Sequence, residues 1–283
     1  MREQTLGELL RELREEKGVS KTQLCEGICS RTALARYEEN ERVPDKFVVD
    51  CLLERLGKNV ARLEFISSDE EYERSQYRFQ IEEKMRLSEY EAAETLLKTY
   101  SRAVDARDNL HWQYIYAKRG GLLKIRGQYE EAYSLLIDAL TYTERQSLID
   151  TEIADKRLSN IELEILYEIA ENCYYQSQVE KAFFLFTQIE GYLNTLDTDN
   201  EVRIQYYPNV LYWAAVAHVR KGQKHLAIAC LEEAQSLLVK EYRVNGLERV
   251  LELKKQLGVP EMEEKLLAIK LISMSKINGE IPR

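Results

Sequence analysis

The 283-residue chain has few of the residues that break helices, and it has no long apolar run. Its 12 glycines and 4 prolines are together about half of average usage, which favours a largely helical protein. No stretch of about 18 uncharged apolar residues occurs, and charge begins at Arg2. We therefore expect neither a transmembrane helix nor a secretory signal, and predict a cytoplasmic protein that does not bind membranes.

Cysteine occurs in an odd number, which argues against a set of disulfides. All the cysteines fall within apolar helical patterns, so we interpret them as buried free thiols in a reducing compartment. They are Cys25, Cys29, Cys51, Cys173 and Cys230. Cys25 and Cys29 have no second pair that could complete a zinc site, so no metal site is predicted.

The sequence also lacks the motifs of common enzyme classes. It contains no glycine-rich phosphate loop, no Gly-x-Ser-x-Gly element and no His-Glu-x2-His pair. Of its 3 histidines, His218 and His225 are interpreted as packing or surface residues. We therefore expect a protein that is not an enzyme and that has neither catalytic residues nor a cofactor.

The net charge of −9 argues mildly against nucleic acid as a partner, but the charge is unevenly distributed. The first 60 residues are nearly neutral, and bases outnumber acids between Lys21 and Arg36. Such a small basic footprint suits one helix placed against one groove of DNA. It also implies weak phosphate binding by a monomer, which dimerisation would double.

The stretch from Lys21 to Glu38 predicts two short helices joined by a tight turn. Ser20 is placed to cap the first helix, Gly27 supplies the turn, and Ser30 caps the second helix. A helix, a glycine turn and a second helix with a polar face make up the helix-turn-helix that binds DNA.

The second of these helices is expected to contact base edges. Ser30, Arg31 and Thr32 would lie at its N-terminal end, with Arg36 one turn later. Arg31 is the best single candidate for sequence preference, because a guanidinium can donate two hydrogen bonds to guanine. The residues predicted to contact phosphates or flanking bases are Lys21, Gln23, Arg42 and Lys46. The alternative for each is an ordinary solvated side chain.

The N-terminal region resembles the phage-repressor-like DNA-binding domain (the XRE family, lambda-repressor type). The resemblance covers residues 5–58 and rests on Leu6-Gly7-x3-Arg11-x2-Arg14, Gly18-Val19-Ser20, Leu24, Ile28-Cys29-Ser30, Ala35-Arg36-Tyr37-Glu38 and Val43-Pro44. The sequence departs from the family pattern at Lys21, where glutamine is common, and at Asn40, where glycine is usual. Asparagine tolerates a left-handed backbone, so the turn is expected to survive.

From about residue 74 the sequence contains an internal repeat. Each repeat places a small alanine at the same position of an apolar helix, where it allows close packing on a partner helix. The marker alanines are Ala93, Ala132, Ala182 and Ala227. The clearest unit, from Tyr116 to Ala139, resembles the tetratricopeptide repeat, with a spacing longer than the usual ~34 residues.

The predicted architecture is therefore all-α. A lambda-repressor-like helix-turn-helix domain is expected over residues 1–58, a linker over 59–73 and a tetratricopeptide-like α-solenoid over 74–283. Residues 244–257 suggest part of a further repeat, and a terminal helix over 262–277 is expected to cap the open end of the array.

Helix pairs stacked in this way form a curved array whose first helices line the inner face. Aromatic rings, an amide and paired charges are expected on that face, a mixture that suits an extended peptide. The candidate peptide-binding residues are Arg78, Arg86, Tyr114, Lys118, Tyr167, Glu171, Tyr174, Asn209, Tyr212 and Trp213. The alternative for any one of them is that it faces solvent or packs between helices.

The order of the two domains resembles the peptide-pheromone-responsive regulators of Gram-positive bacteria, the Rgg- and PlcR-like members of the RRNPP group. That resemblance implies a cytoplasmic homodimer that binds a double-stranded DNA operator. It also implies a short signalling peptide, secreted and re-imported, that changes DNA binding in quorum sensing. The competing hypothesis is a repeat-based adaptor that binds protein partners and whose N-terminal domain is vestigial.

Overall fold

The computed structural model describes residues 5–58, 68–143, 145–198, 200–241, 243 and 246–260. Within these residues the chain is all-helical, as predicted, with no strand. The chain forms two compact units, residues 1–185 and 186–283. Across the described part, no helix has both the length and the apolar character needed to span a bilayer.

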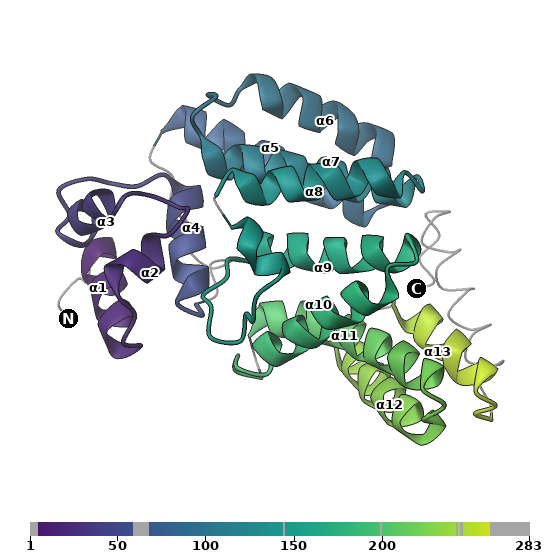
Figure 1. The fold of residues 1–283 in the computed structure, drawn as a ribbon. Helices are drawn as coiled ribbons and strands as arrows, with labels where there is room; N and C mark the ends of the chain where they lie inside the picture. The colour runs from purple at the N-terminus through teal and green to yellow at the C-terminus, as the bar shows by residue number, and fades with distance from the viewer. Residues whose placement is uncertain are drawn as a thin grey trace, which may run out of the picture. The chain divides into compact units, whose positions relative to one another are not determined.

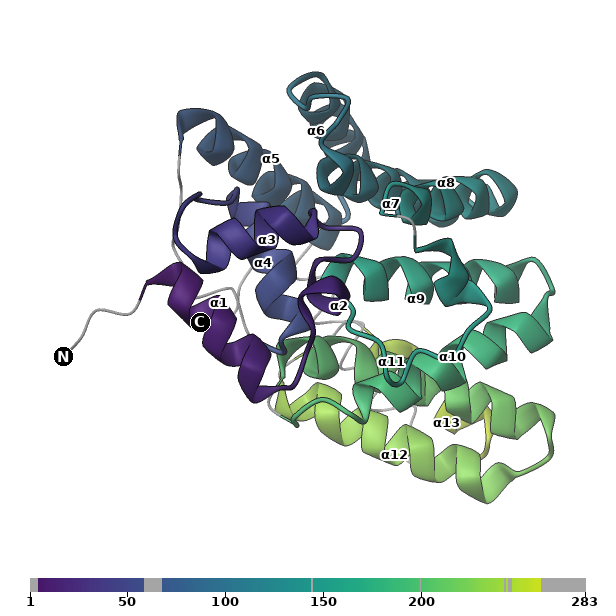
Figure 2. The same cartoon turned by 60° about the vertical axis from the view of Figure 1, so that its left-hand side comes forward.

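The first four helices make a small bundle with its own core (Figures 1 and 2). They are α1 (Leu6–Glu16), α2 (Lys21–Cys25), α3 (Arg31–Glu38) and α4 (Lys46–Arg55). The side chains of Thr5, Ser20 and Ser30 cap the first three helices, and the sequence predicts the last two of these caps. Leucines from all four helices fill the core between them: Leu10, Leu24, Leu34 and Leu52.

The asparagine that replaces the usual glycine after α3 adopts the conformation that glycine would supply. Asn40 has a φ of 58°, and its side-chain oxygen accepts a hydrogen bond from the amide of Gly7 at 3.1 Å. A side chain at Gly7 would not fit, because an added Cβ would lie 2.3 Å from the carbonyl oxygen of Tyr37. The N-terminal end of α1 is therefore joined closely to the end of α3.

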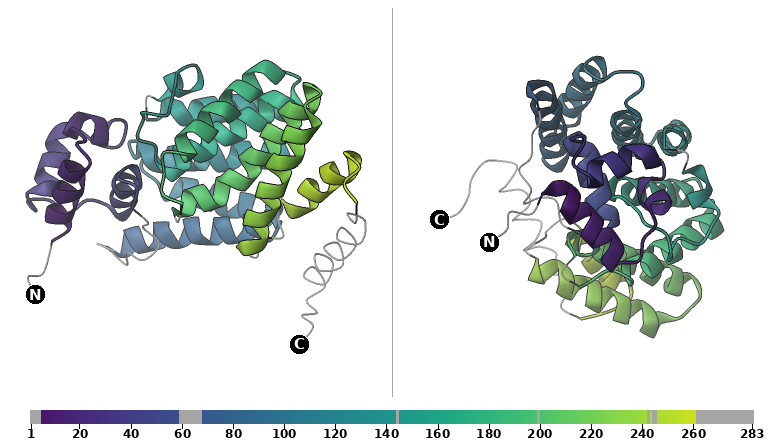
Figure 3. Two further views of the ribbon diagram at one scale, coloured as in Figure 1. Left: turned by 90° about the horizontal axis from the view of Figure 1, so that it is seen from below. Right: turned by 90° about the vertical axis from the view of Figure 1, so that its left-hand side faces the viewer.

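The rest of the described chain is built from helices that follow one another in pairs. The first unit contains α5 (Asp69–Arg86), α6 (Tyr90–Arg102), α7 (Asn109–Ile125), α8 (Tyr129–Thr141), the 3₁₀-helix η1 (Gln146–Ile149) and α9 (Asn160–Tyr175). Helix α10 (Val179–Leu193) crosses into the second unit, which also contains α11 (Glu201–Arg220), α12 (Lys224–Lys240) and α13 (Leu247–Gln256). Helices α11 and α12 lie side by side along their length (Figure 3).

The same turn ends the first helix of each pair, which confirms the predicted repeat. A residue with positive φ closes the helix, at Ser88, Gly127, Ser177 and Gly222. The next amide donates to a carbonyl one turn back, as from Gln128 to Leu123 at 3.0 Å. All four marker alanines are completely buried on the second helix of their pair. Helix α13 ends in the same turn, at Gly258.

The predictions for the linker, the terminal helix and the cysteines differ from the structure or lie partly outside the described residues. Helix α5 already begins at Asp69, capped by Ser68, whereas the predicted linker covers 59–73; residues 59–67 of that linker lie outside the described residues. The terminal helix predicted over 262–277 also lies outside them. All five cysteines are free thiols, but Cys29 and Cys230 are only half-buried, because each lies at the edge of its packed face.

Candidate functional site

Helix α3 presents its basic residues on the side opposite to its buried face. Leu34 and Tyr37 pack into the core of the bundle, so Arg31, Thr32 and Arg36 point to solvent. Neither guanidinium has an ion-pair or hydrogen-bond partner among the described residues. The structure thus brings three of the predicted base-contacting residues together on one accessible face.

The other predicted DNA-binding side chains are already engaged within the protein. Ser30 caps α3 by accepting from the amide of Ala33 at 3.1 Å, and Gln23 accepts from the amide of Ser20 at 3.0 Å. Lys46 pairs with Asp50 at 2.7 Å. Of the remaining two, Lys21 pairs with Glu38, and the guanidinium of Arg42 lies over the ring of Tyr37. DNA contact by these residues stays a prediction.

Lys21 belongs to a buried charge cluster at the end of α3. The carboxylate of Glu38 is completely enclosed and accepts from Arg14 at 2.6 Å, with Lys21 at 3.1 Å on its other oxygen. Burial opposes ionisation of Glu38, but Arg14 and Lys21 together hold its pKa below the usual value. The cluster sets the position of α3 relative to α1 and α2.

A buried ion pair attaches the N-terminal bundle to the repeat helices of the same unit. Arg55 of α4 donates to the carbonyl of Leu24 at 3.0 Å and pairs with Glu162 of α9 at 2.7 Å. Glu162 also pairs with Arg145 at 3.1 Å, and Arg145 reaches Glu26 beside the turn of the helix-turn-helix. Burial would raise the pKa of Glu162, but the two guanidinium groups lower it, so the carboxylate stays charged.

A second contact between bundle and repeats is aromatic. The guanidinium of Arg78 lies 4.3 Å from the ring centroid of Phe47 on α4, and it donates to the hydroxyl of Tyr100 at 3.1 Å. His111 packs edge-on against the same phenylalanine at 5.2 Å. Burial, with the nearby charge of Arg78, lowers the pKa of His111 to about 3, so its ring is neutral. Arg78, a predicted peptide-binding residue, is instead used in this contact.

Two close backbone contacts complete the attachment. Glu54 of α4 accepts from the amide of Asn160, the first residue of α9, at 2.9 Å. Burial, with Asp50 and Glu162 nearby, raises the pKa of Glu54 to about 8. At the turn of the helix-turn-helix, a Cβ added to Gly27 would lie 2.2 Å from the carbonyl oxygen of Thr143. Only glycine fits at that point.

Ion pairs and hydrogen bonds between side chains link α5, α7 and α9, the first helices of the first three pairs. This set of contacts is called the ladder below. Tyr114 donates to Glu82 at 3.0 Å, and Lys118 pairs with Glu82 at 2.7 Å and with Glu164 at 2.6 Å. Burial would lower the pKa of Lys118, but the two carboxylates raise it above its usual value. Two of the predicted peptide-binding residues therefore form this ladder.

The ladder continues towards the far ends of α7 and α9. Lys124 pairs with Glu168 at 2.8 Å and with Glu171. Glu171 also accepts from the hydroxyl of Tyr167 at 2.7 Å. Sequence reasoning placed Tyr167 and Glu171 in the candidate site but missed Glu164 and Glu168. These acids precede Glu171 by seven and three residues, a helical spacing that could have revealed them.

The remaining predicted peptide-binding residues are not part of the ladder. Arg86 is exposed at the end of α5, and Tyr174 packs against Phe183 in a tilted arrangement with ring centroids 6.0 Å apart. In the second unit, Asn209 accepts from Arg249 at 2.6 Å, and the same guanidinium lies over Tyr212 at 4.7 Å. Trp213 is buried.

The burial of Trp213 has a simple packing cause within the second unit. Its indole stacks on Phe186 with a centroid separation of 4.9 Å and an interplanar angle of 11°. A ring stacked in this way contributes to the core, so peptide contact by Trp213 is the least supported of the ten predictions. Among the described residues, no cluster of histidine, cysteine and acidic side chains is arranged to hold a metal ion.

Comparison with known proteins identifies the N-terminal domain and the fold. Residues 5–64 match the family described as helix-turn-helix domain. No protein with a curated description matches the sequence. Among solved structures, the chain is similar to Bacillus thuringiensis PlcR in complex with the peptide PapR7 and DNA, at 17% identity with a TM-score of 0.57 over 98% of both chains. The N-terminal domain is thus a helix-turn-helix domain, and the chain shares the all-helical fold of PlcR.

Two structures of the competence regulator ComR are more distant. The apo form from Streptococcus vestibularis is 16% identical with a TM-score of 0.43, and the match covers 90% of this chain and 99% of that one. ComR from S. thermophilus, in complex with DNA and its signalling peptide ComS, is 14% identical with a TM-score of 0.38 over 94% and 100% of the two chains.

Proposed function

We propose that the chain is a sequence-specific DNA-binding transcriptional regulator, controlled by a short signalling peptide on the inner face of its repeat domain in quorum sensing. It acts in the cytoplasm as a homodimer on a two-fold operator. Arg31 and Arg36 on α3 are exposed and have no partner among the residues that the structure describes, which supports DNA as one partner. The fold shared with PlcR, whose structure holds a peptide and DNA, supports a peptide as the other.

The observation that carries this proposal is the direct attachment of the helix-turn-helix domain to the repeats. Arg55 and Glu162 are both almost completely buried, so α9 cannot move away from α4 without leaving the charge of Arg55 uncompensated. The same α9 supplies Glu164, Glu168 and Glu171 to the ladder that links the first helices. A peptide that favours one position of α9 therefore also favours one position of the DNA-binding domain.

The test is a comparison of operator affinity with and without peptide. Any bound peptide is first recovered from the purified protein and sequenced, and the operator is selected from a random DNA library. Operator affinity is then measured by fluorescence anisotropy at one fixed salt concentration. We expect saturating peptide to change it by about 5- to 150-fold, the usual range of coupling between two sites.

Equal operator affinity with and without saturating peptide would contradict peptide control. A protein that binds no DNA sequence preferentially, but that captures a specific protein partner, would instead support the adaptor hypothesis.

A further inference from the structure

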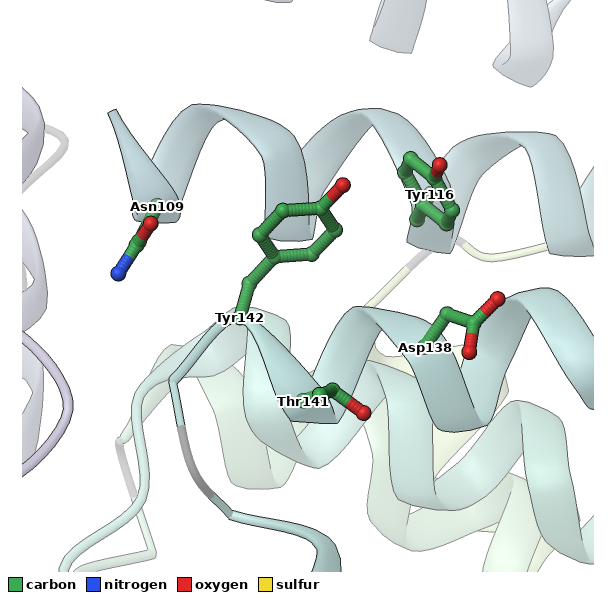
Figure 4. Close-up of a pocket in the computed structure, with 5 residues that line it drawn as sticks. All are labelled: Asn109, Tyr116, Asp138, Thr141 and Tyr142. Carbon is green, nitrogen blue, oxygen red and sulfur yellow. The ribbon is translucent and has the colours of Figure 1, made fainter. Parts of the chain in front are cut away.

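A pocket of about 420 Å³ lies between α7 and α8 in the first unit (Figure 4). Its lining residues are Asn109, Tyr116, Asp138, Thr141 and Tyr142. Tyr116 follows Tyr114 by two residues, and two residues correspond to about 200° around an α-helix. The pocket therefore lies on the side of α7 opposite to the ladder that Tyr114 joins, and the proposed peptide site does not include it.

Aromatic rings form one side of this pocket. Tyr116 and Tyr142 meet in a T-shaped arrangement with ring centroids 5.1 Å apart. Trp112 lies parallel to Tyr142 at 6.3 Å, and its indole donates to the carbonyl of Asp105 at 3.0 Å. These contacts hold the tyrosine rings in place, and the negative face of an aromatic ring attracts a cation.

The polar side of the pocket is negative. Asp138 lies on α8 across from Tyr116 on α7 (Figure 4), and its carboxylate forms no ion pair within the described part of the chain. Arg119, whose charge acts on Tyr142, donates to Ser101 at 3.4 Å. Burial and a hydrogen bond with Tyr116 raise the pKa of Tyr142 to about 12, so that phenol stays neutral. Among the described residues that line the pocket, Asp138 alone has a formally charged side chain.

We propose that this pocket binds an organic cation, an alkylammonium or guanidinium group, between the rings of Tyr116 and Tyr142 and the carboxylate of Asp138. The rings attract positive charge to their faces, and the carboxylate supplies the counter-ion. The hydroxyl of Thr141 and the side-chain amide oxygen of Asn109 also line the pocket and can accept hydrogen bonds from the N–H groups of the cation. An anion would meet the charge of Asp138 and is excluded.

An occupant of the pocket would also act on the helix-turn-helix domain. Tyr142 is followed by Thr143, whose hydroxyl accepts from the buried amide of Gln113 at 2.7 Å. The carbonyl of Thr143 lies against Gly27, in the turn between α2 and α3. A cation that fixes the position of Tyr142 therefore also fixes the adjacent backbone at Thr143, which contacts that turn. This inference does not depend on the proposed peptide site.

The test uses the full-length chain with the Trp213→Phe substitution, so that Trp112 is the only fluorescent tryptophan. N-acetyl-arginine amide is the probe, and N-acetyl-citrulline amide, which replaces the guanidinium by a neutral urea of the same shape, is its control. We expect saturable quenching by the arginine probe, and binding that is about three- to tenfold weaker for the citrulline probe. Calorimetry on the unsubstituted chain provides the same comparison without the Trp213 change.

The variants Asp138→Asn and Tyr142→Leu should weaken binding of the arginine probe by a similar factor, whereas Glu130→Gln, an exposed carboxylate at the start of α8, should not. Equal binding of the two probes, or an Asp138→Asn variant with unchanged affinity, overturns the proposal. If the cation comes from a second copy of the chain, self-association in sedimentation will weaken on Asp138→Asn. The absence of both saturable binding and Asp138-dependent association also overturns it.

Discussion

Of the three basic residues between Lys21 and Arg36, two reach solvent and one is bound to an enclosed carboxylate. Arg31 and Arg36 project from the exposed side of α3, while Lys21 pairs with Glu38. The substitution of lysine for the common glutamine at position 21 therefore supplies a counter-charge inside the domain. Sequence preference is then expected to depend mainly on Arg31.

We predict that Arg31→Ala weakens sequence-specific DNA binding by about 1–3 kcal/mol, because a guanidinium that bridges a guanine contributes that much discrimination. Gel shifts with the selected operator and with a scrambled fragment measure the loss. Arg102→Ala is the matched control, since Arg102 is also an exposed arginine but lies on α6. If operator affinity is the same before and after the Arg31 change, the assignment of Arg31 is wrong.

The buried carboxyl group of Glu54 should make stability depend on pH. Its pKa is raised from 4.5 to about 8 in the folded protein, so the folded state binds a proton that the unfolded chain releases above pH 4.5. The contribution of Glu54 is therefore fully present below pH 4.5 and is lost as pH rises to 8. Its slope is at most about 1.4 kcal/mol per pH unit.

We predict that Glu54→Gln removes this dependence, because glutamine is neutral and can still accept from Asn160. Urea denaturation at pH 5, 6.5 and 8 should show the variant gaining stability relative to the parent chain as pH rises. Glu16→Gln, an exposed acid at the end of α1, should leave the curve parallel to that of the parent. A Glu54→Gln curve parallel to the parent would show that the pKa of Glu54 is not raised.

At the scale of elements, the repeat depends on small residues where two helices approach. Gly120 on α7 faces Leu136 on α8, and an added Cβ would lie 2.7 Å from the leucine Cγ. The marker alanine Ala132 lies next to this point and is completely buried. Both residues allow the first and second helices of the pair to pack at close range.

Gly120→Ala should therefore destabilise the protein, even though alanine is the better helix former. Gly191→Ala is the matched control, because Gly191 lies inside α10 and no atom of the described residues is within 4 Å of its added Cβ. There alanine should stabilise by up to about 1 kcal/mol. Thermal denaturation of the two variants separates helix propensity from packing. A stabilised Gly120→Ala variant would show that α7 and α8 can move apart at no cost.

In the whole molecule, the DNA-binding domain and the first repeats belong to one compact unit rather than to two separate domains joined by a linker. Arg55 and Glu162 connect them, with Arg145 and Glu26 as a second link. Breaking a buried pair from one side leaves an uncompensated charge, whereas replacing both partners removes the problem.

Glu162→Gln is therefore expected to destabilise the protein by about 3–5 kcal/mol. The double variant Arg55→Met/Glu162→Met should recover most of that loss in urea denaturation and should at the same time weaken the peptide's effect on operator affinity. Arg107→Gln breaks an exposed pair with Asp105 and should change neither quantity measurably. A double variant that is no more stable than Glu162→Gln would contradict this prediction.

The elements and their order follow from local patterns in the sequence. The caps at Ser20 and Ser30, the turn at Gly27 and the four marker alanines are local signals, and each lies where its pattern predicts. The exposed face of α3 was predictable for the same reason. Helical periodicity places Leu34 and Tyr37 on one side and Arg31 and Arg36 on the other.

Which charged and aromatic residues make internal contacts depends instead on how the helices pack in the tertiary structure. Arg78 lies over Phe47, Lys118 is enclosed by Glu82 and Glu164, and Trp213 stacks on Phe186. These partners come from different helices, and the Arg55–Glu162 pair joins residues 107 positions apart. No local sequence pattern predicts such a pairing. The pairing depends on which helices pack against each other and on the need of every buried charge for a counter-charge.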